Sequence, residues 1–204
     1  TLVEKISLAF ADSIVTINQQ CAEVFISRSC PRNKISVVMN SPDESIFRFH
    51  PPRVQTNDSR NKPFVIMYHG TIVERNGLDL AVDAFARVIA SIPNARLRIY
   101  GSRNAYLDGV LDTAKKLGLE HAIEYLGPKP LEQIVEPIEE CDVGIIPNRR
   151  NIFTELNTPT RIFEYLALGK PVVAPRAPGI SDYFDDESIF FFELGNAEDL
   201  AKRI

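Results

Sequence analysis

The chain has 204 residues, of which 45% are hydrophobic and 25% charged, the composition of an ordinary globular protein with a real core. Its net charge of −4 gives no reason to expect nucleic acid as a partner. Cys21, Cys30 and Cys141 are odd in number and not at metal-ligand spacing, which favours a reducing, cytoplasmic compartment. No apolar run reaches the ~18 residues of a membrane span and no signal peptide is recognisable, but peripheral attachment to the inner face of the cell membrane stays open.

The first quarter of the chain predicts part of an α/β unit. Residues 13–17 are a β-branched strand, residues 19–28 an amphipathic helix with Asn18 as its N-cap, and residues 35–38 another short strand. Polar residues then gather over residues 55–63, which indicates a linker.

The rest of the chain alternates strands and helices more regularly. Strands are expected at residues 64–69, 97–100, 123–126, 143–146, 171–174 and 188–193, and helices at 78–91, 107–117, 132–140, 159–168 and from 197 onward. This alternation predicts an α/β fold with a Rossmann-like parallel sheet and helices on both faces. Ligands of such sheets bind beyond the carboxyl ends of the strands. The loops 70–77, 101–104, 127–131 and 147–160 are therefore the expected binding region.

The stretch from Asn157 to Ala174 is the most informative. Thr158 is expected to cap the helix and Pro159 to occupy its first position, so that the free amides of Thr160 and Arg161 can receive a phosphate. Glu164 lies further along an otherwise apolar helix. A buried carboxylate needs a partner, and sugar hydroxyls would suit it. The pattern indicates a nucleotide-sugar site.

These residues resemble a known family. Ala-Asp-Ser-Ile-Val at residues 11–15, the run from Lys34 to Phe47, and Pro-Thr-Arg-Ile-Phe-Glu-Tyr-Leu-Ala-Leu-Gly-Lys-Pro-Val-Val-Ala at residues 159–174 are similar to the GT-B fold retaining glycosyltransferases of family 4, the group 1 glycosyltransferases. The resemblance implies a fragment: residues 1–54 would be a remnant of the acceptor-side Rossmann-like domain with its linker. Residues 55–204 would be the donor-binding domain, truncated at its C-terminus.

Two motifs of that family are matched only in part. The first has a glycine followed by an arginine and then a lysine, which neutralise the leaving pyrophosphate. Gly70 matches the glycine, but Thr71 and Asn76 stand where the two cations are expected. The resemblance therefore implies that Arg75 takes this catalytic role, or that Arg161 supplies the charge.

The second motif is a pair of glutamates separated by seven residues. Glu164 matches the member that binds the donor's ribose, while Leu156 stands where the other is expected. The role of facing the transferred sugar passes to the neighbouring Glu155, passes to Asn157 and Thr158, or is lost.

The resemblance gives a full set of expected site residues. The catalytic ones are Arg75 and Glu155, and the substrate-binding ones are Gly70, Thr71, Arg75, Asn76, Gly127, Lys129, Asn148, Thr158, Thr160, Arg161 and Glu164. Structural alternatives stay open: an ion pair of Glu164 with Arg161 one turn earlier, a solvated Arg75, and a packing role for His69. No metal or other cofactor is implied.

The implied function of the parent protein is transfer of a hexosyl unit, with retention, from a nucleotide diphosphate sugar to a glycan or lipid-linked acceptor. A GT-B nucleotide-sugar 2-epimerase is one alternative, and a non-catalytic nucleotide-sugar binding module is another. The fragment alone is expected to bind nucleotide weakly without transferase activity.

Overall fold

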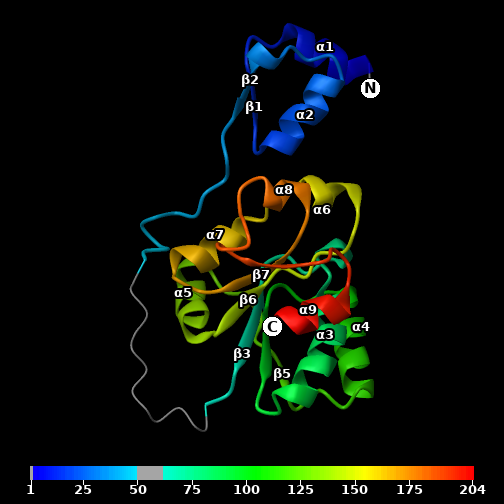
Figure 1. Cartoon of the computed structure of the whole chain (residues 1–204), viewed down its shortest axis with the longest axis vertical. Helices are drawn as coiled ribbons and strands as arrows, with labels where there is room; N and C mark the ends of the chain where they lie inside the picture. The colour runs from blue at the N-terminus through cyan, green and yellow to red at the C-terminus, as the bar shows by residue number, and fades with distance from the viewer. Residues whose placement is uncertain (1, 50–61) are drawn as a thin grey trace.

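The computed structural model describes residues 2–49 and 62–204. The first described part is a small α/β unit, drawn in blue at the top of Figure 1. Its elements are α1 (Leu2–Phe10), β1 (Ile14–Thr16), α2 (Gln19–Ser27), the 3₁₀ turn η1 (Arg32–Lys34) and β2 (Ile35–Val37). β1 and β2 pair in parallel, with Ile14 opposite Ile35. This agrees with the predicted strand–helix–strand unit.

The second described part carries the larger sheet. Its strands are β3 (Val65–His69), β4 (Arg96–Tyr100), β5 (Ile123–Tyr125), β6 (Val143–Ile145), β7 (Val172–Pro175) and β8 (Phe190–Phe192). Its helices are η3 (Glu74–Asn76), α3 (Leu78–Ser91), α4 (Ala105–Lys116), α5 (Leu131–Glu140), α6 (Ile152–Leu156), α7 (Thr160–Ala167), α8 (Pro178–Ser181) and α9 (Ala197–Arg203).

The six strands are all parallel and lie in the order β5-β4-β3-β6-β7-β8. The chain winds outward from β3 in one direction and then, starting at β6, in the other. The order therefore reverses between β3 and β6, and beyond the carboxyl ends of the strands at such a point an α/β sheet presents its ligand crevice.

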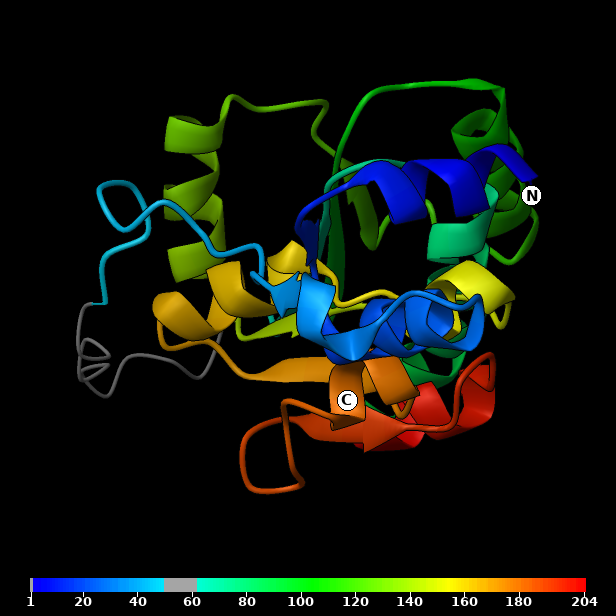
Figure 2. The same cartoon turned by 90° about the horizontal axis from the view of Figure 1, so that it is seen from above.

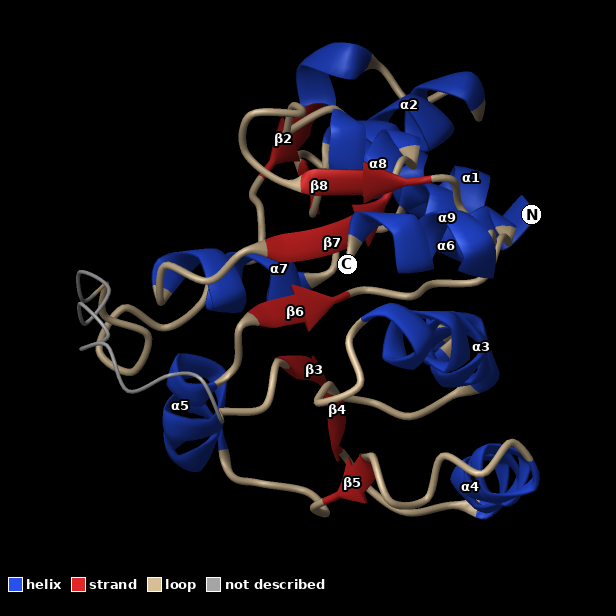
Figure 3. Ribbon diagram, turned by 60° about the horizontal axis from the view of Figure 1, so that its bottom comes forward, coloured by secondary structure: helices blue, strands red, loops and turns tan. Residues whose placement is uncertain are grey.

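Helices cover both faces of this sheet (Figure 3). One buried apolar cluster joins α3, α4 and α9 to the sheet through residues such as Phe85, Leu107 and Leu200. A second cluster, on the opposite face, joins α5, α7 and α8 to it through Ile138, Ile162 and Ile180. The predicted Rossmann-like fold with helices on both faces is confirmed.

The helix α7 is fixed to the sheet by one close contact. Tyr165 is fully buried, and its hydroxyl donates a hydrogen bond to the Met67 carbonyl, 2.9 Å away. Its ring lies against Gly144 of β6, where an added Cβ would stand 2.5 Å from a ring carbon. A side chain at position 144 would push α7 off the sheet, so glycine sets the position of the helix.

The two units meet at the N-terminus of α2 (Figures 1 and 2). Asn18 is fully buried: its side-chain oxygen accepts from the Cys21 amide and so caps α2. Its amide nitrogen donates to the Leu156 carbonyl at 2.6 Å and to Thr158 Oγ1 at 3.1 Å. The Gln19 amide donates to the Tyr183 hydroxyl at 2.7 Å. The predicted cap is confirmed, and it also joins the units.

Several predictions need correction or lie out of reach. Thr158 does not cap α7: Pro159 is the N-cap, and Thr158 Oγ1 instead donates to the Gly179 carbonyl. The short helices α6 and α8 fall where no helix was expected, and β8 is shorter than the expected strand 188–193. Most of the expected linker and the boundary at 54/55 lie outside the described residues. None of the described helices has the length and apolarity needed to cross a membrane.

Candidate functional site

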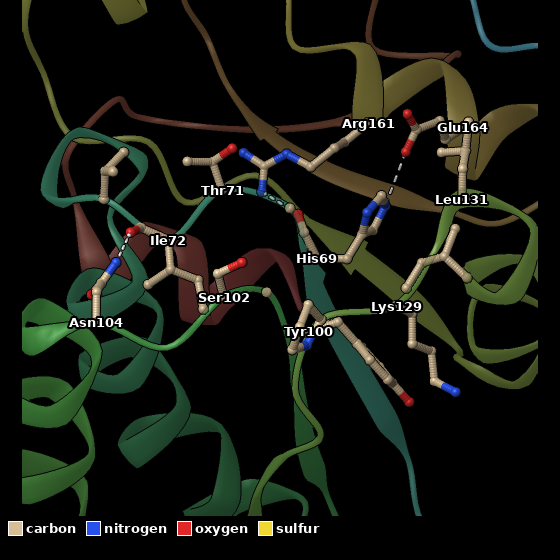
Figure 4. Close-up of a pocket in the computed structure, with 15 residues that line it drawn as sticks. His69, Thr71, Ile72, Tyr100, Ser102, Asn104, Lys129, Leu131, Arg161 and Glu164 are labelled. Atoms are coloured by element: carbon tan, nitrogen blue, oxygen red, sulfur yellow. Dashed lines mark hydrogen bonds and ion pairs between the residues drawn. The ribbon is translucent and has the colours of Figure 1, made fainter.

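A cavity of about 440 Å³ opens beyond the carboxyl ends of β3, β4 and β5, under the N-terminal half of α7 (Figure 4). It is lined by His69, Gly70, Thr71, Ile72, Val73, Tyr100, Gly101, Ser102, Asn104, Pro128, Lys129, Leu131, Ile134, Arg161 and Glu164. The cavity therefore occupies the edge of the sheet where the topology places a ligand.

Two glycines shape its floor. Gly70 has a left-handed φ of +112°, and a Cβ there would stand 3.0 Å from Arg161 Cδ. At Gly101 a Cβ would stand only 2.4 Å from the Gly70 carbonyl oxygen. Because neither position tolerates a side chain, the two loops pack backbone to backbone and leave main chain exposed to the cavity.

Arg161 lies over the first of these loops. Its Nη1 donates to the His69 carbonyl at 2.7 Å, and its guanidinium stands 4.8 Å from the centre of the Tyr68 ring. The alternative ion pair with Glu164 is not formed among the described residues. The guanidinium is thus held by a carbonyl and a ring beside Gly70 and Thr71, and no carboxylate of the described residues forms an ion pair with it.

Glu164 reaches the cavity one turn further along α7. The residue is 9% exposed, and Oε2 is 3.4 Å from His69 Nε2. Burial raises the pKa of Glu164 above 4.5, with the Arg161 charge opposing the shift. Burial, helped by Arg161, lowers the pKa of His69 to about 3, so its imidazole is uncharged at neutral pH.

Hydrogen bonds from the neighbouring loops hold the cavity walls. Asn104 caps α4 through its side-chain oxygen and donates from its amide nitrogen to the Ile72 carbonyl, 2.7 Å away. Asn76 donates to the Thr71 carbonyl at 2.7 Å, and the Tyr68 hydroxyl donates to the same oxygen at 2.8 Å. The loop that follows β3 is therefore fixed at both of its ends.

The structure brings together part of the expected substrate-binding set. Gly70, Thr71, Lys129, Arg161 and Glu164 line the cavity. The expected residues that do not line it are Arg75, Asn76, Gly127, Asn148, Thr158 and Thr160. Of these, Gly127 immediately precedes the lining Pro128 and Asn76 supports Thr71. Thr158 is occupied by the contact with Gly179, so it supports α7 from behind.

Arg75 and Glu155, the two expected catalytic residues, do not line this cavity. The Arg75 guanidinium stands 4.9 Å above the Phe153 ring, beside a second cavity of about 560 Å³. Glu155 forms an ion pair, at 3.2 Å, with Arg150, which lines that second cavity.

The second cavity is lined by Glu74, Arg75, Arg149, Arg150, Asn151, Leu194 and Gly195. Its cations are largely matched by carboxylates, since Arg149 pairs with Asp79 and Arg150 with Glu155. This balance of charge gives it no strong attraction for an anion.

Sequence reasoning missed the part that His69 plays in the cavity wall and treated it as a packing residue. Its signal was its place as the last residue of β3, directly before Gly70. The structure also shows Asn148 Oδ1 buried without a hydrogen-bond partner among the described residues. No cluster of three or more metal-ligating side chains occurs in residues 2–49 and 62–204.

Fold and cavity together define a Rossmann-type α/β protein with a cavity beside the switch point of its sheet. The sequence profile of "Glycosyl transferases group 1" matches residues 53–204, well over half of the chain. The chain therefore belongs to the group 1 glycosyl transferases, and its sheet is that of the GT-B fold.

Curated relatives are related at moderate identity. The chain is 25% identical over 192 residues to the amylovoran biosynthesis glycosyltransferase AmsK of Erwinia amylovora. The match covers 92% of this chain and 45% of that protein. It is 24% identical over 212 residues to the capsular polysaccharide biosynthesis glycosyltransferase CapM of Staphylococcus aureus, covering 100% and 54%. The chain thus spans about half the length of these relatives.

Solved structures share the fold. Anabaena HepE in complex with UDP and glucose superposes with a TM-score of 0.78 at 19% identity, covering 98% of this chain and 55% of that one. Sucrose-phosphate synthase of Thermosynechococcus elongatus also gives 0.78 at 19% identity, covering 99% and 50%.

Proposed function

We propose that the whole protein to which this chain belongs transfers a hexosyl unit from a nucleotide diphosphate sugar to a glycan or lipid-linked acceptor, with retention of configuration. The observation that carries the proposal is the convergence of Gly70, Arg161 and Glu164 on one cavity at the switch point of the sheet. Family membership supports the reaction class. The UDP and glucose named for HepE support the donor class, and the capsular polysaccharide biosynthesis named for CapM supports the acceptor class.

In this proposal the pyrophosphate lies beside Gly70 and Arg161. The Thr160 and Arg161 amides at the start of α7 precede the first intrahelical hydrogen bond, which the Ile162 amide donates to the Pro159 carbonyl, and with the guanidinium they attract negative charge. As the bond from the sugar's anomeric carbon to the phosphate oxygen breaks, the leaving diphosphate takes the electron pair. Stabilisation of that charge is what accelerates the step. Arg161 therefore takes the role of the family's two loop cations, since Arg75 faces the other cavity.

Glu164 would accept hydrogen bonds from the ribose hydroxyls of the donor. Its carboxylate is nearly buried in the cavity, where the His69 Nε2 stands 3.4 Å away. A bound diol would supply the hydrogen-bond donors that a buried carboxylate needs. The group that receives the acceptor's proton is expected on the acceptor-side domain. No residue of this chain is assigned to it.

A non-catalytic binding module is the second candidate. It is favoured by the placement of Glu155 against Arg150, which leaves no α6 carboxylate facing the cavity. The test is to incubate the whole protein with UDP-, GDP- and ADP-hexoses and an acceptor extract, and to determine the anomer of any product by NMR. Transfer with retention, lost in Glu164→Ala, supports the proposal. Binding without turnover supports the module, and an epimerised donor without acceptor supports a 2-epimerase.

A further inference from the structure

His69 has a buried ring nitrogen without a hydrogen-bond partner. The residue is 5% exposed, and Nε2 makes no hydrogen bond with any described residue. Buried polar side-chain atoms in folded proteins are nearly always paired. An unpaired one that lines a cavity therefore calls for an explanation in terms of what the cavity holds.

The groups that face the His69 ring are few. Glu164 Oε2 stands 3.4 Å from Nε2, and the two side chains point toward each other across the cavity wall (Figure 4). The Tyr165 ring contacts the imidazole edge to face at 4.9 Å. The Arg161 guanidinium binds the His69 carbonyl rather than the ring. Glu164 is thus the only acceptor among these neighbours.

The ring is held more firmly than the carboxylate. His69 ends β3, its carbonyl is bonded to Arg161, and its ring packs against the fully buried Tyr165. Glu164 is joined to α7 by a flexible stem that can move its oxygens by the few tenths of an ångström that a hydrogen bond needs. A neutral imidazole with its proton on Nε2 can donate that bond.

We propose that His69 is a positioning residue of the donor site, whose Nε2–H holds one oxygen of Glu164 and turns the other toward the vicinal hydroxyls of the bound nucleotide. This inference rests on the proposed function, because it assigns a partner to the carboxylate that binds the ribose. A purely packing role for His69 would require the shape of the ring but not its nitrogen.

The test compares two substitutions in the whole protein. His69→Gln keeps an N–H donor at similar reach, whereas His69→Leu keeps apolar bulk and loses the donor. Affinity is measured by calorimetry for the preferred nucleoside diphosphate and for its 2′,3′-dideoxy analogue. A hydrogen bond to a charged group corresponds to a change of roughly tenfold or more in affinity. His69→Leu is expected to lower the affinity for the nucleoside diphosphate by about tenfold. His69→Gln is expected to stay within about threefold of the wild type.

The dideoxy analogue and a double variant separate positioning from structure. The analogue should bind wild type and His69→Leu equally, since it has no diol to present. In a Glu164→Ala background, His69→Leu should cause no further loss of affinity for the nucleoside diphosphate. A double-mutant cycle measures this. The inference would be overturned if His69→Leu lowered the affinity for both ligands equally. It would also be overturned if His69→Leu caused the same loss of diphosphate affinity in the Glu164→Ala background.

The outcome also distinguishes this inference from the function on which it rests. If Glu164→Ala loses diphosphate affinity and His69→Leu does not, the donor site stands and the role of His69 is wrong. If the wild type binds none of the nucleoside diphosphates, both are wrong. Melting curves of each variant without ligand show that it is folded. Should His69→Leu not fold, His69→Asn, which shortens the reach of the donor, replaces it with the same expected loss.

Discussion

At the scale of single residues, the proposed donor site takes its positive charge from one guanidinium on α7 and not from the loop after β3. Thr71 lines the cavity without charge, Asn76 supports it through a hydrogen bond, and Arg161 lies over Gly70 from α7. Charge for a pyrophosphate is thus available from the opposite wall of the cavity.

Arg161→Gln should therefore weaken nucleoside diphosphate binding by about tenfold to a hundredfold, since a charge-assisted contact is lost. The corresponding nucleoside, which has no phosphate, should bind nearly unchanged. Isothermal titration of both ligands checks this. Arg203→Gln on α9, an exposed arginine outside the cavity, is the matched control and should change neither affinity. Equal weakening of nucleoside and diphosphate would show that Arg161 acts on the fold and not on the phosphates.

His69 also makes a prediction about stability. Its pKa is lowered from 6.5 to about 3 in the folded state, mainly by burial. Below pH 6.5 the unfolded chain therefore binds a proton at His69 that the folded chain does not bind. The free energy of unfolding consequently decreases as the pH is lowered from 6.5 to about 3. The loss is about 1.4 kcal/mol per pH unit, or roughly 2 kcal/mol between pH 6.5 and about pH 5.

Urea unfolding of wild type and His69→Gln at those two pH values isolates this loss, because glutamine does not titrate. The variant should lose roughly 2 kcal/mol less than the wild type on acidification. Identical slopes in the two proteins would mean that His69 takes up its proton while folded.

At the scale of elements, the contact between the two units depends on one capping residue. Asn18 caps α2 and donates two hydrogen bonds to the segment that leads into α7. Thr158 and Gly179 continue the same network, and a Cβ at Gly179 would stand 2.4 Å from the Leu156 carbonyl oxygen. The first turn of α7 is therefore supported from the small unit of residues 2–49.

Asn18→Ala should destabilise the protein by about 2–4 kcal/mol, because it removes a cap and leaves buried partners unpaired. Asn196→Ala is the matched control: Asn196 also caps a helix, α9, but bonds only to near neighbours. It should cost about 1 kcal/mol. Chemical denaturation of both variants gives the comparison, and equal costs would contradict the joining role of Asn18.

Substitutions at two glycines test how α7 packs against the sheet. Gly144→Ala places a methyl group in steric conflict with the Tyr165 ring. It should lower the free energy of unfolding by several kcal/mol, on the order of a strongly overpacked core. Gly109 lies within α4 with nothing near its added Cβ, so Gly109→Ala should gain about 0.5–1 kcal/mol. Thermal melting of the pair should give shifts of opposite sign. A neutral Gly144→Ala would show that the ring is free to move.

The sequence predicts most of this architecture because apolar periodicity and caps are local signals. Asn18 and the apolar stripe of α3 show this directly. Thr158 was wrongly predicted to cap α7 because a threonine before a proline is a good local cap. Only the fold shows that its hydroxyl donates to the Gly179 carbonyl and accepts from the Asn18 amide. The helix α6 was missed because its five residues are too few for a periodic pattern.

The site follows the same rule. Gly70, Arg161 and Glu164 could be singled out from the sequence because each lies in a motif at a strand end or helix start, and all three line the cavity. The direction of Arg75 could not be predicted, because it is set by Phe153, far along the chain. His69 was interpreted as a packing residue because a residue that ends a buried strand has the pattern of a core residue until its neighbours are known.

At the scale of the whole molecule, the strand order β5-β4-β3-β6-β7-β8 places the carboxyl ends of β3, β4 and β5 around one cavity. The unit of residues 2–49 contacts the larger unit beside the start of α7, the helix that also carries Arg161 and Glu164 into the cavity.

The most direct test of the donor site is a crystal structure of the protein with its preferred nucleoside diphosphate. We expect pyrophosphate oxygens within hydrogen-bond distance of Arg161 and the Gly70 loop, and both ribose hydroxyls within hydrogen-bond distance of Glu164. A nucleotide bound instead beside Arg75, Arg149 and Arg150, with Glu164 left facing only His69, would contradict it.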